Sequence, residues 1–155
     1  MKFKDNQNIL ENYGKRYLFF IPKVFMIEIK TSKRIEIVDI TERVREIVES
    51  QDVVDGIALV YTKHTTTAVV VNENESGLKE DILKVLEKLI PSGAGYMHDR
   101  IDNNADSHLR AILMGSSVVI PITNGKLDLG TWQRILFVEL DGPRVRRVVV
   151  KVIPC

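Results

Sequence analysis

The sequence predicts an α+β fold in which antiparallel or mixed β-sheet layers carry two to three packed helices. Segments rich in β-branched residues or with period-two alternation occur along the whole chain, and segments with helical spacing of apolar residues lie between some of them. Tight turns join the last strand segments, which favours antiparallel pairing over a doubly wound parallel sheet. With 155 residues, 45% of them hydrophobic and 28% charged, the chain is long enough for one domain with its own core. We expect this domain to cover residues 26–155, after an N-terminal extension over residues 1–25.

The first expected elements are two strands and a short helix. Apolar and polar residues alternate over residues 25–29 and again over 34–38, which predicts a hairpin of half-buried strands. Asp39, followed three residues later by Glu42, has the spacing of a capping box. Apolar residues at helical spacing follow, so we expect an amphipathic helix over about residues 40–50 that lies on a sheet.

Two strands, a longer helix and a loop form the middle of the chain. The segments 56–62 and 65–71 are rich in β-branched residues and predict strands. Apolar residues recur at intervals of three and four over residues 76–90, and Pro91 ends this helix. The polar stretch 92–106 is long for a loop in a compact domain, and such loops are commonly functional.

A short helix and a run of strands complete the prediction. Ser107 is a suitable N-cap for a helix over residues 108–114, which Gly115 would end in a left-handed conformation. An antiparallel meander then covers residues 117–122, 131–140 and 144–153, with turns at Asn124-Gly125 and at Asp141-Gly142-Pro143.

The charge balance of the chain indicates which kinds of binding partner to expect. The 22 Lys and Arg residues nearly balance the 21 Asp and Glu residues, giving a net charge of +1. The sequence therefore argues against nucleic-acid and membrane partners.

Cys155 is the single cysteine, so we expect a reducing, cytoplasmic setting. The apolar run 17–21 is too short to span a bilayer and is followed by Pro22 and Lys23, so we expect it to pack on the domain or on a neighbouring subunit.

All three histidines lie in polar clusters, a distribution that predicts a site. Imidazole is the commonest transition-metal ligand, so His64, His98 and His108 would form an open divalent-metal site if the fold brings them together. No pair has a spacing that forces two ligands onto one face, and histidines in polar turns also serve to satisfy backbone groups. Asp99 could orient an imidazole or bind the metal directly, whereas Asp106 could simply favour the start of a helix.

Other polar residues suggest contacts to an anion. Glu139 falls on an apolar strand face and needs a cationic partner, which Arg144 or Arg146 could supply, either as a structural ion pair or at a site edge. Thr131 and Gln133 follow Gly130 and offer donors suited to a phosphate or amide group.

Several of these segments together resemble the YjbQ-like family over about residues 26–153. They are His64-Thr65-Thr66-Thr67-Ala68, Asn72-Glu73, Tyr96-Met97-His98-Asp99, Ser107-His108, residues 117–121, Gly125 and Gly130-Thr131-Trp132-Gln133. The resemblance implies a YjbQ-like α+β fold, a homotrimer and a secondary thiamine-phosphate synthase activity. That reaction joins a hydroxymethylpyrimidine diphosphate to a thiazole phosphate and releases pyrophosphate.

We therefore expect a metal-dependent enzyme that acts on a phosphorylated small molecule. The expected site comprises catalytic His64, His98, Asp99, His108 and Glu139, phosphate-binding Thr131, Gln133 and Arg144, and metal-binding His64, His98 and His108. The expected metal is zinc, with magnesium as the alternative. Two other functions stay open: a hydrolase that uses a metal-bound water, and a non-catalytic metabolite-binding trimer with a structural metal.

Overall fold

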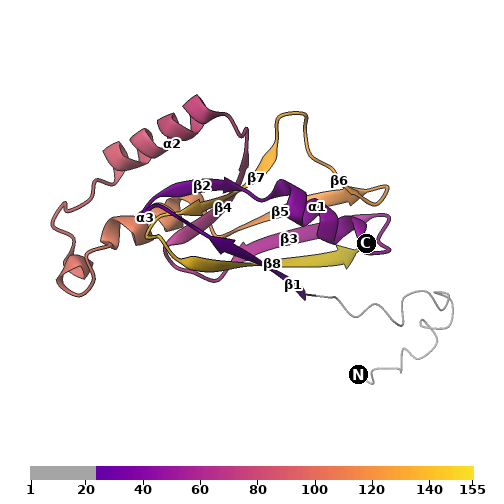
Figure 1. The fold of residues 1–155 in the computed structure, drawn as a ribbon, viewed down its shortest axis with the longest axis horizontal. Helices are drawn as coiled ribbons and strands as arrows, with labels where there is room; N and C mark the ends of the chain where they lie inside the picture. Colours follow the sequence, from indigo (N-terminus) through magenta and orange to yellow (C-terminus); the bar gives the residue numbers. More distant parts are fainter. Residues whose placement is uncertain (1–23) are drawn as a thin grey trace, which may run out of the picture.

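Two antiparallel sheets and three α-helices make up the part of the chain that the computed structural model describes, residues 24–155 (Figure 1). The elements in chain order are β1 (Val24–Lys30), β2 (Glu36–Asp39), α1 (Thr41–Glu49), β3 (Gly56–Thr62), β4 (Thr67–Asn72), α2 (Ser76–Leu89), the 3-10 turn η1 (Met97–Arg100), α3 (Ala105–Met114), β5 (Ser117–Thr123), β6 (Lys126–Leu127), β7 (Arg134–Glu139) and β8 (Val145–Pro154). The predicted α+β class is confirmed. Residues 1–23, most of the expected extension, lie outside the described residues.

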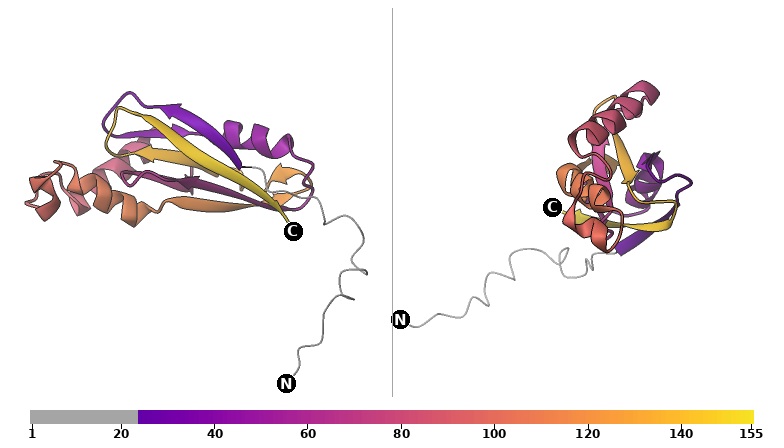
Figure 2. Two further views of the ribbon diagram at one scale, coloured as in Figure 1. Left: turned by 90° about the horizontal axis from the view of Figure 1, so that it is seen from below. Right: turned by 90° about the vertical axis from the view of Figure 1, so that its left-hand side faces the viewer.

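The core lies between the two sheets. One sheet has the strand order β1-β8-β3-β5-β6 and the other β2-β7-β4, and Figure 2 shows them as stacked layers. Alternate residues of the larger sheet, such as Val60 and Val150, pack against Phe137 of β7 and against Val44 of α1. All four of these side chains are fully buried. Every second residue of each strand thus enters the core, and burial of these apolar side chains stabilises the packing of the two layers.

Strand pairing differs from the prediction in two places. The first two strands do not form a hairpin, because β1 pairs with β8 and β2 pairs with β7. The expected meander is also wrong: β5 and β6 form a hairpin around Asn124 and Gly125, which both have positive φ, but β7 and β8 belong to different sheets. Alternation shows that a strand has a buried face but does not identify its partner.

The start of α1 also differs from the prediction. Its N-cap is Ile40, which makes no side-chain capping bond. The Asp39 carboxylate accepts from the backbone N–H of Thr41 at 2.9 Å, while Glu42 forms an ion pair with Arg45. The capping box is therefore wrong, although the helix itself is confirmed.

The third helix begins three residues earlier than the sequence suggested. Asn104 is its N-cap, and Ser107 lies inside the helix, where its hydroxyl donates to the carbonyl oxygen of Leu140 at 2.6 Å. Gly115 ends the helix with φ 93° and ψ 154°, a positive φ but not the left-handed helical conformation. Among residues 24–155, no helix is long and apolar enough to cross a membrane.

Candidate functional site

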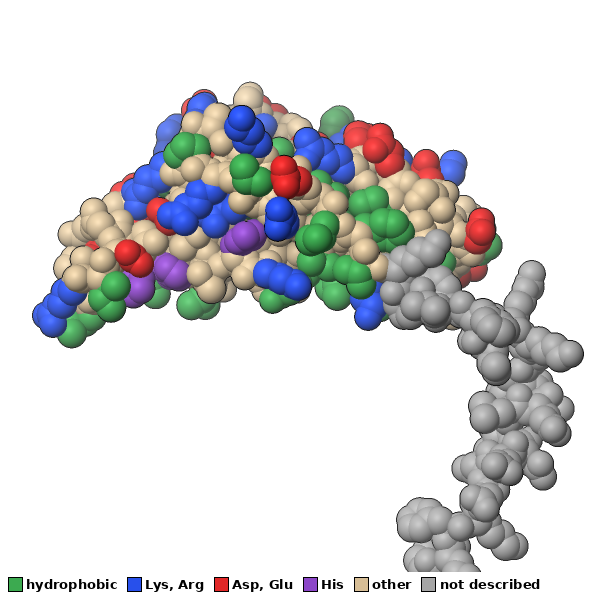
Figure 3. Space-filling model, turned by 60° about the horizontal axis from the view of Figure 1, so that its bottom comes forward, with side chains coloured by type: hydrophobic (Ala, Val, Ile, Leu, Met, Phe, Trp, Pro, Cys, Tyr) green, Lys and Arg blue, Asp and Glu red, His purple; other side chains and the backbone are tan. Residues whose placement is uncertain are grey.

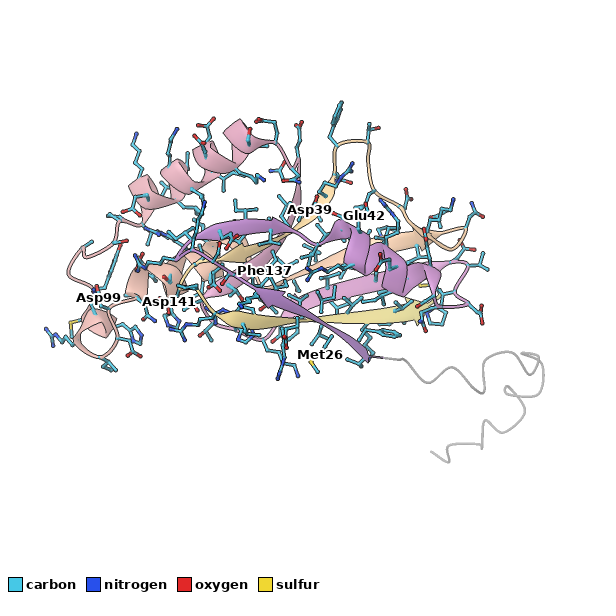
Figure 4. The ribbon with its side chains drawn as sticks, in the orientation of Figure 1. Met26, Asp39, Glu42, Asp99, Phe137 and Asp141 are labelled. Atoms are coloured by element: carbon cyan, nitrogen blue, oxygen red, sulfur yellow. The ribbon has the colours of Figure 1, made fainter. Side chains whose placement is uncertain are left out.

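A polar cleft opens at the end of the sandwich where β3, β7 and α3 meet. Its volume is about 680 Å³. The lining residues are Lys63, His64, Thr65, Thr66, Asp102, Asn103, Asn104, His108, Asp141, Arg144 and Arg146, and we call this the histidine cleft. Histidine, lysine and arginine side chains gather on the face drawn in Figure 3. Asp141 and Asp99 lie at the same end of the molecule (Figure 4).

The loop between β3 and β4 positions His64. Thr62 ends β3 and Thr67 begins β4, and their hydroxyls hydrogen-bond at 2.7 Å. The Thr67 hydroxyl also donates to the carbonyl oxygen of His64 at 3.2 Å. These bonds hold a short loop closed between two strands, so the imidazole has a fixed place beside β8.

The imidazole of His64 is held by a hydrogen bond that it accepts. Its Nε2 accepts from the backbone N–H of Arg147 at 3.0 Å. Burial lowers the pKa of His64, and the nearby Arg146 charge lowers it further, against the opposing effect of Glu139. A neutral imidazole that accepts at Nε2 carries its proton on Nδ1. In this arrangement His64 has no free lone pair for a metal or for a substrate proton.

The lowered pKa of His64 predicts a loss of stability in mild acid. Because the folded-state pKa lies below the ordinary value of about 6.5, protonation favours the unfolded chain. The contribution of His64 is therefore present above pH 6.5 and is lost as the pH falls through the lower folded-state pKa. Urea unfolding between pH 7.5 and 5 measures this loss. We expect His64→Gln to flatten the pH dependence, and the matched variant His98→Gln to keep it. A flat profile in the unsubstituted protein would contradict the prediction.

His98 and His108 contact each other directly. The rings, from η1 and α3, have centroids 4.9 Å apart and an interplanar angle of 76°. His108 also shares the histidine cleft with His64. Within residues 24–155, however, no three His, Cys, Asp or Glu side chains lie close enough together to hold a metal. The structure thus pairs two of the three predicted ligands and leaves His64 in a separate hydrogen bond.

The acidic residues near the histidines have structural contacts. Asp99 accepts from the backbone N–H of Ala105, the first residue of α3, at 3.0 Å. Among the described residues it forms no hydrogen bond with His98 or His108, so the expected orienting role is not seen. Asp106 is 2% exposed and forms ion pairs with Arg34 and Arg110 at 3.1 Å each.

Glu139 pairs with Arg146, one of the two partners that the sequence allowed. The Arg146 Nε and Nη2 donate to the two carboxylate oxygens at 2.7 and 2.6 Å, and Glu139 is fully buried. Arg146 also donates to the Thr66 hydroxyl at 3.1 Å. Glu139 therefore lies behind the cleft and holds the Arg146 guanidinium in place, and its predicted catalytic role stays a prediction. Arg144 instead pairs with Asp141 at 3.0 Å, with 57% of its side chain exposed.

Thr131 and Gln133 lie outside the histidine cleft. They line a separate cavity of about 340 Å³ together with Asn72, Glu73 and the 71% exposed Trp132. Within a single chain they do not share a cavity with Arg144, and their predicted contact with phosphate stays a prediction. They precede β7 and Arg144 follows it, and a six-residue strand separates its two ends by about 20 Å.

Several cleft residues were not predicted as site residues from the sequence, among them Lys63 and Asn104. Lys63 directly precedes His64 and forms no ion pair within the described part of the chain. Asn104 donates to Asp141 at 3.1 Å, but its buried Oδ1 has no hydrogen-bond partner among residues 24–155. The only sequence signal for Lys63 was its position beside a histidine, and for Asn104 its position in the long polar loop.

Comparison with known proteins places this architecture in context. A family model described as UPF0047 protein YjbQ-like matches residues 25–155. A UPF0047 protein of Archaeoglobus fulgidus is 63% identical over 125 residues, which cover 81% of this chain and 97% of the relative. The crystal structure of a YbjQ-like protein of unknown function from Sulfolobus solfataricus P2 has a TM-score of 0.83 at 41% identity and covers 87% of this chain and 100% of that one. A hypothetical protein from Aeropyrum pernix K1 also has a TM-score of 0.83, at 42% identity, and covers 86% and 99%. None of these names specifies a reaction.

Proposed function

This chain belongs to the UPF0047 YjbQ-like family, and we propose that its histidine cleft binds a phosphorylated small molecule and supports a weak thiamine-phosphate synthase reaction. The observation that carries the proposal is the cleft itself. It brings Lys63 and Arg144 together with the imidazoles of His64 and His108 in one polar cavity. Cationic side chains and fixed N–H donors are the groups that recognise phosphate.

Two cations of the cleft could meet an incoming anion. Arg146 is already neutralised by the buried Glu139, and Arg144 pairs with Asp141, whereas Lys63 forms no ion pair among residues 24–155. Arg144 is 57% exposed, so its guanidinium can contact a phosphate beside Asp141. The Nδ1–H of His64 adds a fixed donor. These groups would bind the diphosphate and stabilise the charge that develops on its oxygens as it leaves.

The proposed reaction balances without an oxidant or reductant. The ring nitrogen of the thiazole phosphate attacks the exocyclic methylene carbon of the pyrimidine diphosphate, a C–N bond forms and the C–O bond to diphosphate breaks. The bonding electrons leave with pyrophosphate, and the thiazole becomes a cationic thiazolium. In this proposal His108, which lines the cleft, donates a proton to the leaving oxygen.

A divalent metal fits this chain only in part. His98 and His108 offer two adjacent imidazoles, but no third protein ligand is beside them in the described residues. A metal bound there would need further ligands from substrate, water or a second chain, and when bound it would withdraw charge from the diphosphate. We assign no step of the reaction to it.

Self-association as a homotrimer is part of the proposal. Exposed apolar side chains gather on η1, on the residue that follows it and on α3, beside the two contacting histidines. They are Met97, Ile101, Leu109, Ile112 and Leu113, with Ile101 and Ile112 each 80% exposed. An apolar patch of this kind supports a protein interface, and its position would put the cleft next to the neighbouring subunit.

The synthase proposal predicts a specific dependence on Lys63 and Arg144. With the pyrimidine diphosphate and thiazole phosphate as substrates, we expect thiamine phosphate to form slowly. Lys63→Ala and Arg144→Ala should each lower kcat about 10²-fold, because each removes a cation that stabilises developing charge. Product is measured by mass spectrometry, and Lys84→Ala on the exposed face of α2 is the matched control.

Three outcomes separate the alternatives. Thiamine phosphate at the level of a protein-free control would contradict the synthase. Release of phosphate or pyrophosphate without a new C–N bond would indicate a hydrolase. Calorimetric binding of pyrophosphate without turnover, lost in the Lys63 and Arg144 variants, would indicate a metabolite-binding protein.

The metal proposal predicts that bound metal depends on two histidines rather than three. Protein purified without chelators should contain zinc or another divalent metal, as measured by inductively coupled plasma mass spectrometry. We expect His98→Ala or His108→Ala to remove most of it, because these rings are adjacent. His64→Gln should keep it, because the Nε2 of His64 already accepts from Arg147. An equal loss in all three variants would show that the ring of His64 reorients to bind the metal.

A further inference from the structure

A second cavity adjoins the histidine cleft, and we call it the side cavity. Its volume is about 390 Å³. Four residues line both spaces: Lys63, His64, Thr65 and His108. The two spaces therefore meet at this shared wall, and a ligand that fills the cleft can extend past the two histidines into the side cavity.

The residues that line only the side cavity carry no charge. They come from the end of β3, the start of β4, α3 and the two residues after α3. Two of them, Thr62 and Thr67, use their hydroxyls on each other at 2.7 Å. Tyr61, Ala111 and Ile112 offer one aromatic ring and aliphatic surface. The histidine cleft, in contrast, contains aspartate and arginine side chains, so the two spaces suit different parts of a ligand.

The backbone after α3 keeps the rim of the side cavity open and fixed. A Cβ atom at Gly115, which has φ 93°, would meet no other atom within 4 Å. The carbonyl oxygen of Gly115 accepts from the backbone N–H of Val69 in β4 at 3.1 Å, and that of Ser116 accepts from Thr62 in β3 at 2.9 Å. Since β3 and β4 belong to different sheets, this rim is tied to both layers of the sandwich.

The size and lining of the side cavity indicate what it can hold. Its volume lies within the range of small-molecule sites, roughly 300–1,000 Å³. Tyr61 is 36% exposed, so part of its ring is available to pack against another ring. A phosphate group would lose its hydration there without gaining a cation of its own, because the charged lining residues other than Lys63 lie in the histidine cleft alone. An uncharged organic ring loses little and buries apolar surface.

We propose that the side cavity holds the uncharged ring of a phosphate ester whose phosphate lies in the histidine cleft. The bond between the organic group and the phosphate then lies beside His64 and His108, which line both spaces. Tyr61, Ala111 and Ser116 select the organic group. This inference rests on the proposed function, because the phosphate end needs the cations of the cleft, and it adds the class of organic group that the site accepts.

Isothermal titration calorimetry of the full chain with benzyl phosphate and methyl phosphate tests the proposal. The two esters carry the same charged group and differ in the ring. We expect benzyl phosphate to bind about ten-fold more tightly, because the side cavity removes its ring from water. Ser116→Phe at the exposed rim should abolish this preference and leave the affinity for methyl phosphate unchanged.

A second substitution and a matched control locate the ring. Ala111→Leu fills the α3 wall of the side cavity and should abolish the preference in the same way. Should this buried substitution prevent folding, Ser116→Phe decides alone, because Ser116 is exposed. Ser50→Phe, at the exposed end of α1 and outside both spaces, should keep the preference for benzyl phosphate.

The failure of this inference and the failure of the proposed function give different results. Equal affinity for the two esters in the unsubstituted chain would overturn the inference and leave the phosphate site intact. A preference that survives in the folded Ser116→Phe and Ala111→Leu variants would also overturn it, because the ring would then lie elsewhere. Binding of neither ester and of no pyrophosphate would contradict the proposed function, and the inference with it.

Discussion

Replacing Arg146 by Met is expected to destabilise the protein by about 3–5 kcal/mol, the cost of leaving a buried charge without its partner. Glu139 is fully buried and receives two of its hydrogen bonds from the Arg146 guanidinium, at 2.7 and 2.6 Å. The remaining donors to this carboxylate are neutral: the backbone N–H groups of Leu140 and Asp141 and the hydroxyl of Thr31. Without the arginine, the carboxylate would have to take up a proton or draw in water.

Urea unfolding followed by circular dichroism measures the effect, and the neighbouring arginine gives a matched control. Arg144→Met breaks an ion pair whose cation is 57% exposed, so it should cost less than about 1 kcal/mol. The double variant Glu139→Leu with Arg146→Met should recover much of the loss, because an apolar pair leaves no buried charge. Equal effects of the two arginine variants would contradict the assignment.

Local features of the fold were predictable from the sequence, and strand partners were not. The strand Gly56–Thr62 and the helix Ser76–Leu89 were placed almost to the residue, since period and end signals are encoded within each segment. The expected hairpin of β1 and β2 fails because Ile27 pairs with Val148 of β8, and Val38 with Phe137 of β7. Both strands have one buried face, and that pattern fits either sheet.

The sequence predicted correctly that some polar residues lie near one another, namely those in loops at the same end of the sheets. His64 and Arg144 meet in the histidine cleft because the loops that carry them both follow strands ending there. Thr131 and Gln133 lie outside that cleft because β7 separates them from that end. Thr131 and Gln133 were grouped with Arg144 only because all three can bind phosphate. Their spacing in the sequence does not show that a whole strand keeps the two groups apart.

A buried charge network holds the long loop that carries His98, and breaking it should affect both stability and the site. Arg110 is 1% exposed and donates to the carbonyl oxygen of Ile90 at the end of α2 at 3.0 and 2.7 Å. It also pairs with Asp106, which receives a hydrogen bond from Ser92 at 2.7 Å. These contacts fix both ends of the segment between α2 and α3.

Asp106→Ala is therefore expected to cost about 3 kcal/mol, near the lower end of the range for a broken buried pair, because Glu87 remains to pair with Arg110. Glu80→Ala, which removes an exposed ion pair with Lys84 on α2, should change the free energy of unfolding by less than about 0.5 kcal/mol.

Hydrogen exchange measures local opening of the loop, which the free energy of unfolding does not report. Amides of residues 92–104 should exchange faster in Asp106→Ala under native conditions, while those of β3 and β8 stay protected, because local opening needs only the loss of this network. Unchanged exchange in the loop would show that packing, rather than the charges, holds His98 beside His108.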